Sequence, residues 1–284
     1  MTKHISYQGE PGANSHIACN QAYPDYEPLA CRTFEGTFQA VESGKADLAM
    51  IPVDNTIAGR VADIHYILPR TSLSIVGEYY LPIRFHLMAK PGVAFSSIKY
   101  ARSHIMGLGQ CRDFLREHEI EAVTAADTAG AAREVAEMDS TEVAAIAPSL
   151  AAEVYGLTIL KSHIEDADHN TTRFLIMSRE PGDCRPEDGQ IMTAFIFEVR
   201  NIPAALYKVM GGFATNGVNM TKLESYQLGG SFKSSQFYAE IQGHPDEKSV
   251  QLAFEELGFF SHALKILGVF PMATDNKASL FPLE

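Results

Sequence analysis

Short apolar segments alternate with helix-like segments through the first fifty residues, and this alternation restricts the possible folds more than any other feature. Strands are expected at residues 4–8, 29–33 and 47–53, and helices at residues 15–22 and 37–43. Strands that alternate with helices through short connections form a parallel sheet covered by helices. The sequence therefore predicts an α/β fold that begins with a parallel sheet.

A second lobe is expected next, because the β-rich stretch 72–89 carries the chain away from this sheet. Its expected elements are helices at 107–118 and 129–137, a strand at 143–147 and a helix after Pro148. A strand opened by Thr172 would then return to the first lobe. This bilobal, periplasmic-binding-protein-like domain would span 1–180, with lobe 1 at 1–75 and 160–180 and lobe 2 at 76–159.

The composition changes to Pro, Gly and charged residues at 180–190, which indicates a linker. The expected elements beyond it are strands at 191–200, 218–227, 232–242 and 263–270 and helices at 204–215 and 247–256. This βαββαβ order predicts a ferredoxin-like domain at 191–271. Gly229 and Gly230 are expected to form its hairpin turn, and 272–284 a loosely held tail.

Composition excludes several partners and cofactors. The net charge of -12 comes without a basic stripe, which argues against nucleic acid. No apolar run approaches a membrane span, and residues 1–10 lack the features of an export signal, so we expect a cytoplasmic protein. The four cysteines have no CxxC spacing and no HxxxH motif is present, so we expect reduced thiols, no metal and no cofactor.

The segment Asn170-Thr171-Thr172-Arg173-Phe174 places two hydroxyls and a permanent cation where an apolar strand begins. Side chains at the mouth of a parallel sheet face the crevice in which open α/β folds bind ligands. A small anionic substrate would suit this pair of Thr and Arg. The alternative is that the threonines are ordinary strand residues and Arg173 is a surface charge.

Four other loops combine a strand end with a polar residue at a helix start. Ser15 follows a glycine-rich loop, Asn55 and Thr56 follow a buried strand, Ser103 and Gln110 flank a third junction, and Thr128 opens a helix. An ordinary turn explains the first of these loops equally well, and simple capping by Asp127 or Thr128 explains the last one better. Three polar side chains end the buried strand, those of Asp54, Asn55 and Thr56. A helix cap needs only one of them, so the other two favour a ligand contact.

Read together, these segments resemble prephenate dehydratase with a C-terminal regulatory ACT domain, from about Ile5 to Phe270. Asn170-Thr171-Thr172-Arg173-Phe174 matches the N-x-T-R-F motif of the family, and Pro52-Val53-Asp54-Asn55-Thr56 is similar to P-V-E-N-S. Ser103-His104 and Gly109-Gln110-Cys111 are similar to S-H-P-Q and the Q-C pair, although Met106 departs from the usual proline or its neighbour. The resemblance also covers residues 219–225, Asn-Met-Thr-Lys-Leu-Glu-Ser, which are similar to N-L-T-K-I-E-S.

The resemblance implies decarboxylating dehydration of prephenate to phenylpyruvate in phenylalanine biosynthesis, without a cofactor. Thr172 would donate a hydrogen bond to the departing hydroxyl, and Arg173 would anchor a carboxylate or pair with an acid of the protein. The remaining implied catalytic residues are Asn55, Ser103 and Gln110. The implied substrate-binding residues are Ser15, Thr56, Thr128, Asn170, Thr171 and Phe174. Arogenate dehydratase and a non-catalytic bilobal amino-acid sensor remain as alternatives.

The resemblance further implies that ACT domains pair in a homodimer or homotetramer and bind L-phenylalanine as an allosteric effector. The implied effector positions are Asn201, Ala204, Ala205, Leu206, Asn219, Met220, Glu224 and Ser225. Two departures stand at this site: Pro203-Ala204 occupies the place of the usual glycine of G-A-L, and Tyr226-Gln227 replaces R-P.

Overall fold

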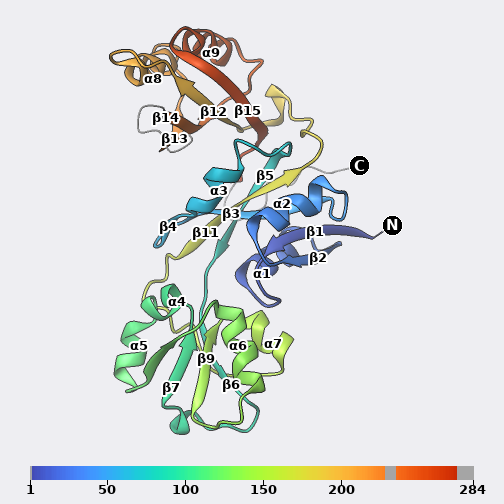
Figure 1. Ribbon diagram of the computed structural model, residues 1–284, viewed down its shortest axis with the longest axis vertical. Helices are drawn as coiled ribbons and strands as arrows, with labels where there is room; N and C mark the ends of the chain where they lie inside the picture. The colour runs from blue at the N-terminus through green and yellow to red at the C-terminus, as the bar shows by residue number, and fades with distance from the viewer. Residues whose placement is uncertain (1, 228–234, 274–284) are drawn as a thin grey trace. The chain divides into compact units, whose positions relative to one another are not determined.

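The computed structural model describes residues 2–227 and 235–273, which divide into two compact units (Figure 1). The first unit comprises Met1–Val61 and Tyr80–Phe174, and the second comprises Ala62–Tyr79 and Leu175–Glu284. Two strands, β5 (Ser74–Pro82) and β11 (Thr171–Ser178), run through the boundaries between them. The expected domain limits at 180 and 191 stay a prediction.

The first unit begins with the expected parallel strands β3, β1 and β2, and β11 lies beside β3 in the order β11-β3-β1-β2. Strand β1 (Lys3–Gln8) pairs in parallel with β2 (Tyr26–Cys31) and β3 (Leu48–Asn55), and α1 (Asn14–Ala22) and α2 (Phe34–Glu42) connect them. A short strand, β4 (Gly59–Arg60), pairs antiparallel with the end of β3. Strand β2 begins three residues before the expected strand, because Tyr26 already pairs with Lys3.

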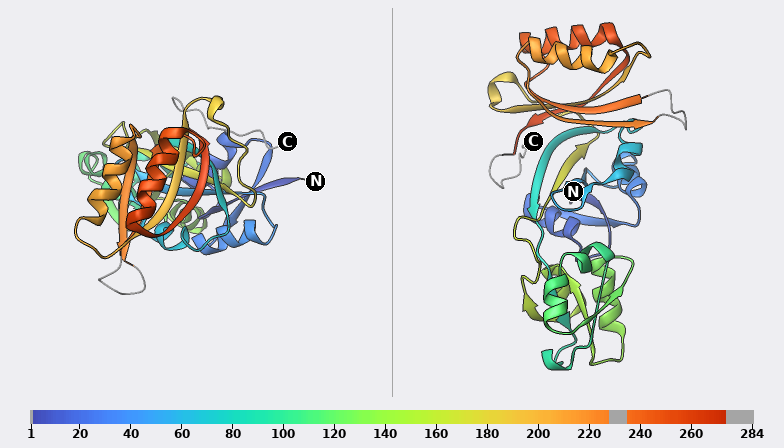
Figure 2. Two further views of the ribbon diagram at one scale, coloured as in Figure 1. Left: turned by 90° about the horizontal axis from the view of Figure 1, so that it is seen from above. Right: turned by 90° about the vertical axis from the view of Figure 1, so that its left-hand side faces the viewer.

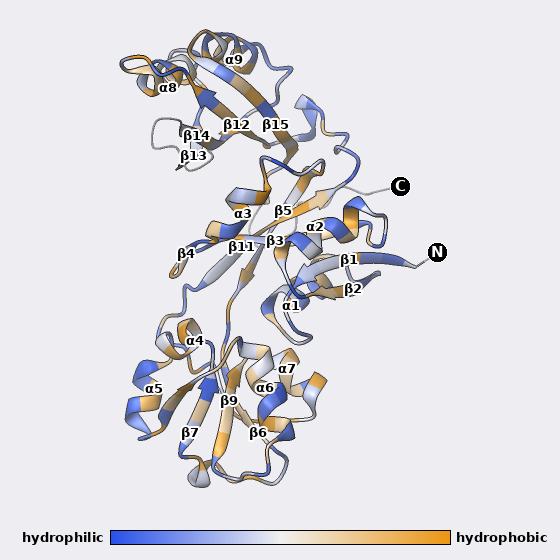
Figure 3. Cartoon of the chain, in the orientation of Figure 1, coloured by the Kyte–Doolittle hydropathy of each residue, from blue (hydrophilic) through white to orange (hydrophobic). Residues whose placement is uncertain are grey.

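A second sheet of the same unit has the order β10-β6-β9-β7-β8. Its strands are β6 (His86–Ala89), β7 (Tyr100–Ser103), β8 (Glu121–Thr124), β9 (Val143–Ala147) and β10 (Thr158–Ser162). Helices α6 (Thr128–Glu137) and α7 (Ser149–Tyr155) follow, and η1 (Phe95–Ser97) is a short 3-10 turn. The central strand β9 is apolar throughout, as a strand buried on both faces requires (Figure 3).

The helix expected at 107–118 is wrong as one element. The chain instead forms α4 (Ile105–Gly109), a break at Gln110 and Cys111, and α5 (Arg112–Glu117). Glycines at 107 and 109 are poor helix formers, and the carboxylate of Asp166 accepts hydrogen bonds from the backbone N–H groups of Arg112 and Asp113. A separate helix, α5, therefore begins after the break, with the Asp166 carboxylate at its first N–H groups.

The second unit contains the expected βαββαβ order. Its elements are β12 (Ile191–Val199), α8 (Ala205–Thr215), β13 (Met220–Gln227), β14 (Ser235–Gln242), α9 (Lys248–Phe260) and β15 (Ser261–Pro271). The strands pair antiparallel in the order β13-β14-β12-β15, and both helices lie on one face of the sheet (Figure 2). A core of aromatic residues, Phe195, Phe197, Phe213 and Phe237 among them, lies between these layers.

Shorter elements complete this unit. Helix α3 (Ala62–Ile67) precedes β5, the 3-10 turn η2 (Pro186–Asp188) lies in the expected linker, and Gly268 of β15 pairs with Ile75 of β5. The expected Gly229-Gly230 turn and residues 274–284 of the expected tail lie outside the described residues. Across residues 2–227 and 235–273, no helix has both the length and the apolar character needed to cross a membrane.

Candidate active site

Asn55 is the hub of a polar cluster at the end of β3. Its Nδ2 donates to Asn170 Oδ1 at 2.7 Å and to Thr172 Oγ1 at 2.9 Å. Its Oδ1 accepts from the backbone N–H groups of Ile57 and Ala58 at 2.9 and 2.7 Å. Because the oxygen already accepts two backbone donors, the NH₂ end of the amide must face Asn170 and Thr172.

The hydroxyl of Thr172 is thereby oriented. Thr172 lies half-buried at the start of β11, and its oxygen accepts the hydrogen bond from Asn55. A hydroxyl carries one proton and can donate while it accepts. Thr172 is therefore set up to donate its own proton away from Asn55, toward a ligand.

Asn170 extends the cluster to the break between α4 and α5. It is 1% exposed, and its Nδ2 donates to Gln110 Oε1 at 2.5 Å. Gln110 lies in the break between α4 and α5 and, with Asn170, lines a cavity of about 130 Å³. Since the oxygen of Gln110 is engaged, the Nε2 end of the amide is the part suited to donate to a ligand.

A second pair of contacts fixes the alignment of β3 and β11 here. The backbone N–H of Thr171 donates to Thr56 Oγ1 at 2.9 Å, and the Thr56 hydroxyl donates to the carbonyl of His169 at 2.9 Å. Both side-chain contacts of Thr56 are thus made with the protein backbone, and they hold Thr172 in line with Asn55.

Arg173, the residue after Thr172 on β11, is buried, with 8% exposure. Its Nη1 lies 3.9 Å from Asp54 Oδ2, and its guanidinium lies 6.0 Å from the ring centre of Tyr80. The sequence left open whether Arg173 binds a carboxylate of the substrate or an acid of the protein. The structure places an acid of the protein, Asp54, beside it.

Ser15 and Thr128 are brought together, but neither takes part in the hydrogen bonds described above. Both line a cavity of about 520 Å³ that also includes Glu10, Arg32 and Asp127. The Asp127 carboxylate caps α6 through the N–H of Gly130. Two carboxylates against one arginine make this cavity less favourable for an anion than its size suggests.

Ser103 and Phe174 also lie outside the cluster. Ser103 is fully buried, and its hydroxyl donates to the carbonyl of Ile146 at 2.6 Å. Phe174 is a buried residue of β11, with 1% exposure. Contacts of these two side chains with a substrate stay predictions.

The expected effector positions lie in the second unit. Asn201 and Ala204 are exposed, Ala205 is buried at the start of α8, and Leu206 packs against the aromatic core. Asn219 Nδ2 donates to Gln242 Oε1 at 2.9 Å, and Glu224 lies 3.2 Å from Lys222. Met220 opens β13, and Ser225 is exposed on the same strand.

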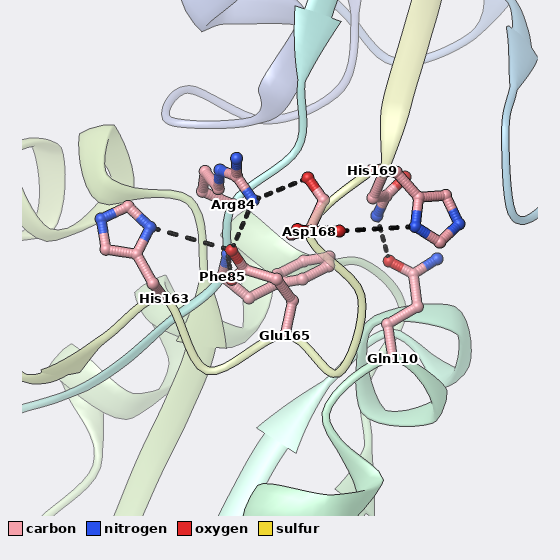
Figure 4. A network of polar contacts seen from close by, with 8 residues as sticks. Arg84, Phe85, Gln110, His163, Glu165, Asp168 and His169 are labelled. Carbon is pink, nitrogen blue, oxygen red and sulfur yellow. Dashed lines mark hydrogen bonds and ion pairs between the residues drawn. The ribbon is translucent and has the colours of Figure 1, made fainter.

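Sequence reasoning missed an ionic network beside Gln110, which is drawn in Figure 4. Its centre is Glu165, whose side chain is 4% exposed and contacts Arg84, Phe85 and His163. Glu165 lies between two elements without any periodic pattern, and its partners Arg84 and Phe85 are about 80 residues away in the chain. The only local signal was an acidic pair, Glu165-Asp166, a few residues before Asn170.

The cluster supplies hydrogen-bond donors rather than a nucleophile. Burial raises the pKa of the Cys111 thiol, which follows Gln110, so this thiol stays protonated at neutral pH. Among the described residues, no group of three His, Cys, Asp or Glu side chains could hold a metal ion. The arrangement suits a reaction in which negative charge develops on a leaving oxygen.

Comparisons with known proteins agree with this geometry. A family model described as prephenate dehydratase matches residues 5–182. A bifunctional N-acyl-homoserine lactone acylase/prephenate dehydratase of Komagataeibacter europaeus is 46% identical and covers 94% of this chain and 95% of its own length. An arogenate dehydratase/prephenate dehydratase of Arabidopsis thaliana is 36% identical, over 94% of this chain and 72% of its own length.

A solved structure gives the same result. The prephenate dehydratase of Arthrobacter aurescens, in complex with L-Phe, superposes with a TM-score of 0.85 at 30% identity, over 94% of this chain and 89% of its own. Fold and comparisons together define the class as a bilobal α/β lyase of the dehydratase type. The chain belongs to the prephenate dehydratase family.

Proposed function

We propose that this protein converts prephenate to phenylpyruvate in phenylalanine biosynthesis. The observation that carries the proposal is the hydrogen bond from Asn55 Nδ2 to Thr172 Oγ1. It directs the proton of Thr172 outward, where a departing hydroxyl needs a donor. The expected location in the cytoplasm stays a prediction, and the Arabidopsis relative is described as chloroplastic.

The reaction needs little more than oriented donors. As the carbon–carboxylate bond breaks, carbon dioxide leaves and its bonding electrons enter the ring. The carbon–oxygen bond then breaks with its electron pair, and the departing hydroxide takes up a proton from solvent and leaves as water. Aromatisation supplies the driving force, so the enzyme must mainly stabilise the charge that develops on the oxygen.

Thr172 stabilises this charge by hydrogen bonding, because a threonine hydroxyl is too weak an acid to give up its proton unaided. Gln110 Nε2 supplies a second donor from the break between α4 and α5. Arg173 contributes positive charge, since the five N–H donors of an arginine can serve a protein carboxylate and a substrate carboxylate together.

The first test is the formation of phenylpyruvate from prephenate by the purified protein. We expect Thr172→Val to lower kcat by about 100- to 1000-fold with little change in KM, as loss of a single oxyanion donor does elsewhere. Thr172→Ser keeps the hydroxyl and should keep most of the activity. Arg173→Ala should mainly raise KM, by about 10- to 100-fold. Equal and small effects of Thr172→Val and Arg173→Ala would overturn the assignment.

Arogenate is the competing substrate, because it differs only by an amino group in place of the keto oxygen. Several plant relatives are described as arogenate dehydratases. The ratio of kcat/KM for the two substrates decides between them, and we expect prephenate to be preferred.

We propose that the second unit is an ACT domain that binds L-phenylalanine and pairs with a second copy. The βαββαβ order and the L-Phe complex described for the Arthrobacter protein support this proposal. We expect phenylalanine to lower turnover and Asn219→Ala to weaken that response. The molar mass in solution, measured by light scattering with and without phenylalanine, tests the pairing.

Hydrolysis of N-acyl-homoserine lactones is a second candidate function. It is favoured by the 46% identity to a relative described as both acylase and dehydratase. The test is release of homoserine lactone from an N-acyl-homoserine lactone. If Thr172→Val abolishes dehydration but not this release, the two activities use different groups.

A further inference from the structure

Two segments connect the sheets of the first unit, residues 83–85 and residues 163–170. They lie side by side and share backbone hydrogen bonds. The N–H of Ile164 donates to the carbonyl of Phe85 at 3.1 Å, and the N–H of Ile83 donates to the carbonyl of Asn170 at 2.8 Å. The position of Asn170 therefore depends on how these two segments are held together.

Glu165 joins the two segments through its side chain. Its carboxylate accepts from Arg84 Nη1 at 3.1 Å and from the backbone N–H of Phe85 at 2.9 Å, and His163 Nδ1 lies 3.7 Å away (Figure 4). Arg84 Nη1 also donates to the carbonyl of Asp168 at 3.1 Å. A carboxylate this buried is costly unless it is paired and hydrogen-bonded, so these contacts fix its place.

The residue after Glu165 reaches the helix break that carries Gln110. The backbone N–H of Asp166 donates to the carbonyl of Gln110 at 2.7 Å, and the Asp166 carboxylate accepts from the N–H groups of Arg112 and Asp113. Asn170, four residues after Asp166, donates its own Nδ2 to Gln110 Oε1. The segment that Glu165 anchors thus contacts Gln110 at both its backbone carbonyl and its side-chain oxygen.

We propose that Glu165 is a positioning residue for the dehydration proposed above. Glu165 binds residues 163–170 to residues 83–85 and so keeps the Gln110 side chain in contact with Asn170. This contact orients Gln110 Nε2, the donor that faces the substrate. Glu165 acts through Gln110 and is not itself a donor to the reacting atoms. A displacement of about 1 Å in such a group can cost about 100-fold in rate.

The experiment compares Glu165→Gln with Asp168→Asn in the full chain. Both variants remove one negative charge from the same segment, but the Asp168 side chain is 99% exposed. We expect Glu165→Gln to lower kcat for prephenate by about 10- to 100-fold with KM changed less than threefold. Asp168→Asn should stay within twofold of the wild type in both constants. Equal losses in the two variants would overturn the inference.

A double-mutant cycle with Gln110→Ala distinguishes positioning from general damage. If Glu165 acts through Gln110, Glu165→Gln should have little further effect once Gln110 is alanine. If the fold-losses in kcat of the two single variants multiply in the double variant, Glu165 acts independently of Gln110, and the inference is overturned. If Glu165→Gln does not fold, Arg84→Met removes the same ion pair from its more exposed partner, and the cycle is repeated with that variant.

The same measurements separate failure of this inference from failure of the proposed function. No turnover of prephenate by the wild type would overturn the function itself. Turnover that falls with Gln110→Ala but not with Glu165→Gln or Arg84→Met would leave the function standing and reject only the role of Glu165.

Discussion

At the scale of single residues, the orientation of one amide organises the site. Asn55 Oδ1 accepts two backbone donors, so its Nδ2 can only donate, and Thr172 must then direct its proton elsewhere. A side chain that only accepts would reverse this order. The direction of the hydrogen bond between Asn55 and Thr172, more than the mere presence of polar side chains, should therefore determine activity.

Asn55→Asp tests that hydrogen-bond direction with almost no change in the shape of the side chain. The carboxylate keeps the contacts to Ile57 and Ala58 but has no proton for Thr172, which would turn its own hydroxyl proton toward the new acceptor. We expect kcat for prephenate to fall by about 100- to 1000-fold. Asn55→Ala serves as the comparison, and an aspartate variant clearly more active than the alanine variant would contradict this account.

Ala204 carries backbone strain where the family resemblance leads one to expect glycine. Its φ is 59°, in the left-handed region, just before α8. Glycine adopts this conformation without a Cβ penalty, which for other residues is about 1–2 kcal/mol. We expect Ala204→Gly to raise the free energy of unfolding by about 0.5–1 kcal/mol, measured by denaturant titration.

Ala214→Gly is the matched control for that prediction, because Ala214 is an exposed residue within α8. There the same change should lower the free energy of unfolding by about 1 kcal/mol, since glycine is a poor helix former. Destabilisation by both variants would show that the left-handed conformation of Ala204 is not strained.

At the scale of elements, the loop from β1 to α1 packs closely on α7. The hydroxyl of Tyr155 donates to the carbonyl of Pro11 at 2.9 Å. Gly12 has φ of 89°, and a Cβ added to it would lie 2.7 Å from Ala151 Cα. Two features therefore require glycine at position 12: the positive φ and the lack of room for a Cβ beside Ala151.

Gly12→Ala should destabilise the protein by about 2–5 kcal/mol, as the sum of a left-handed alanine and an overpacked contact. Gly44→Ala isolates the first effect, because φ at Gly44 is 77° and nothing lies within 4 Å of an added Cβ. We expect the control to lose only about 1–2 kcal/mol, as judged by denaturant titration. Similar losses at the two glycines would mean that the loop moves away from α7 at little cost.

Elements with a strong local pattern were predictable from the sequence, and those defined by distant partners were not. The apolar run of β9 was predicted to the residue, whereas the break between α4 and α5 depends on Asp166, more than 50 residues further on. The site behaves similarly. Asn55, Gln110, Asn170 and Thr172 each stood out by residue type, but the bonds between them span 60 to 117 residues and follow only from the fold.

At the scale of the whole molecule, stability should depend on pH through a buried histidine. His86 is 7% exposed on β6, and its ring lies 5.2 Å from that of His163. Burial lowers the pKa of His86 from its ordinary value of 6.5, the nearby His163 lowers it further, and Glu165 opposes the shift. The folded protein thus favours the neutral imidazole.

A lowered pKa in the folded state means that the unfolded chain takes up the proton first as the pH falls. The contribution of His86 is complete above pH 6.5 and is lost on acidification, by at most about 1.4 kcal/mol per pH unit. We expect His86→Leu to reduce the decline in melting temperature between pH 7 and pH 5. His262→Gln, which changes an exposed histidine, should leave the decline unaltered. A decline as steep in His86→Leu as in the wild type would place the acid sensitivity in other groups.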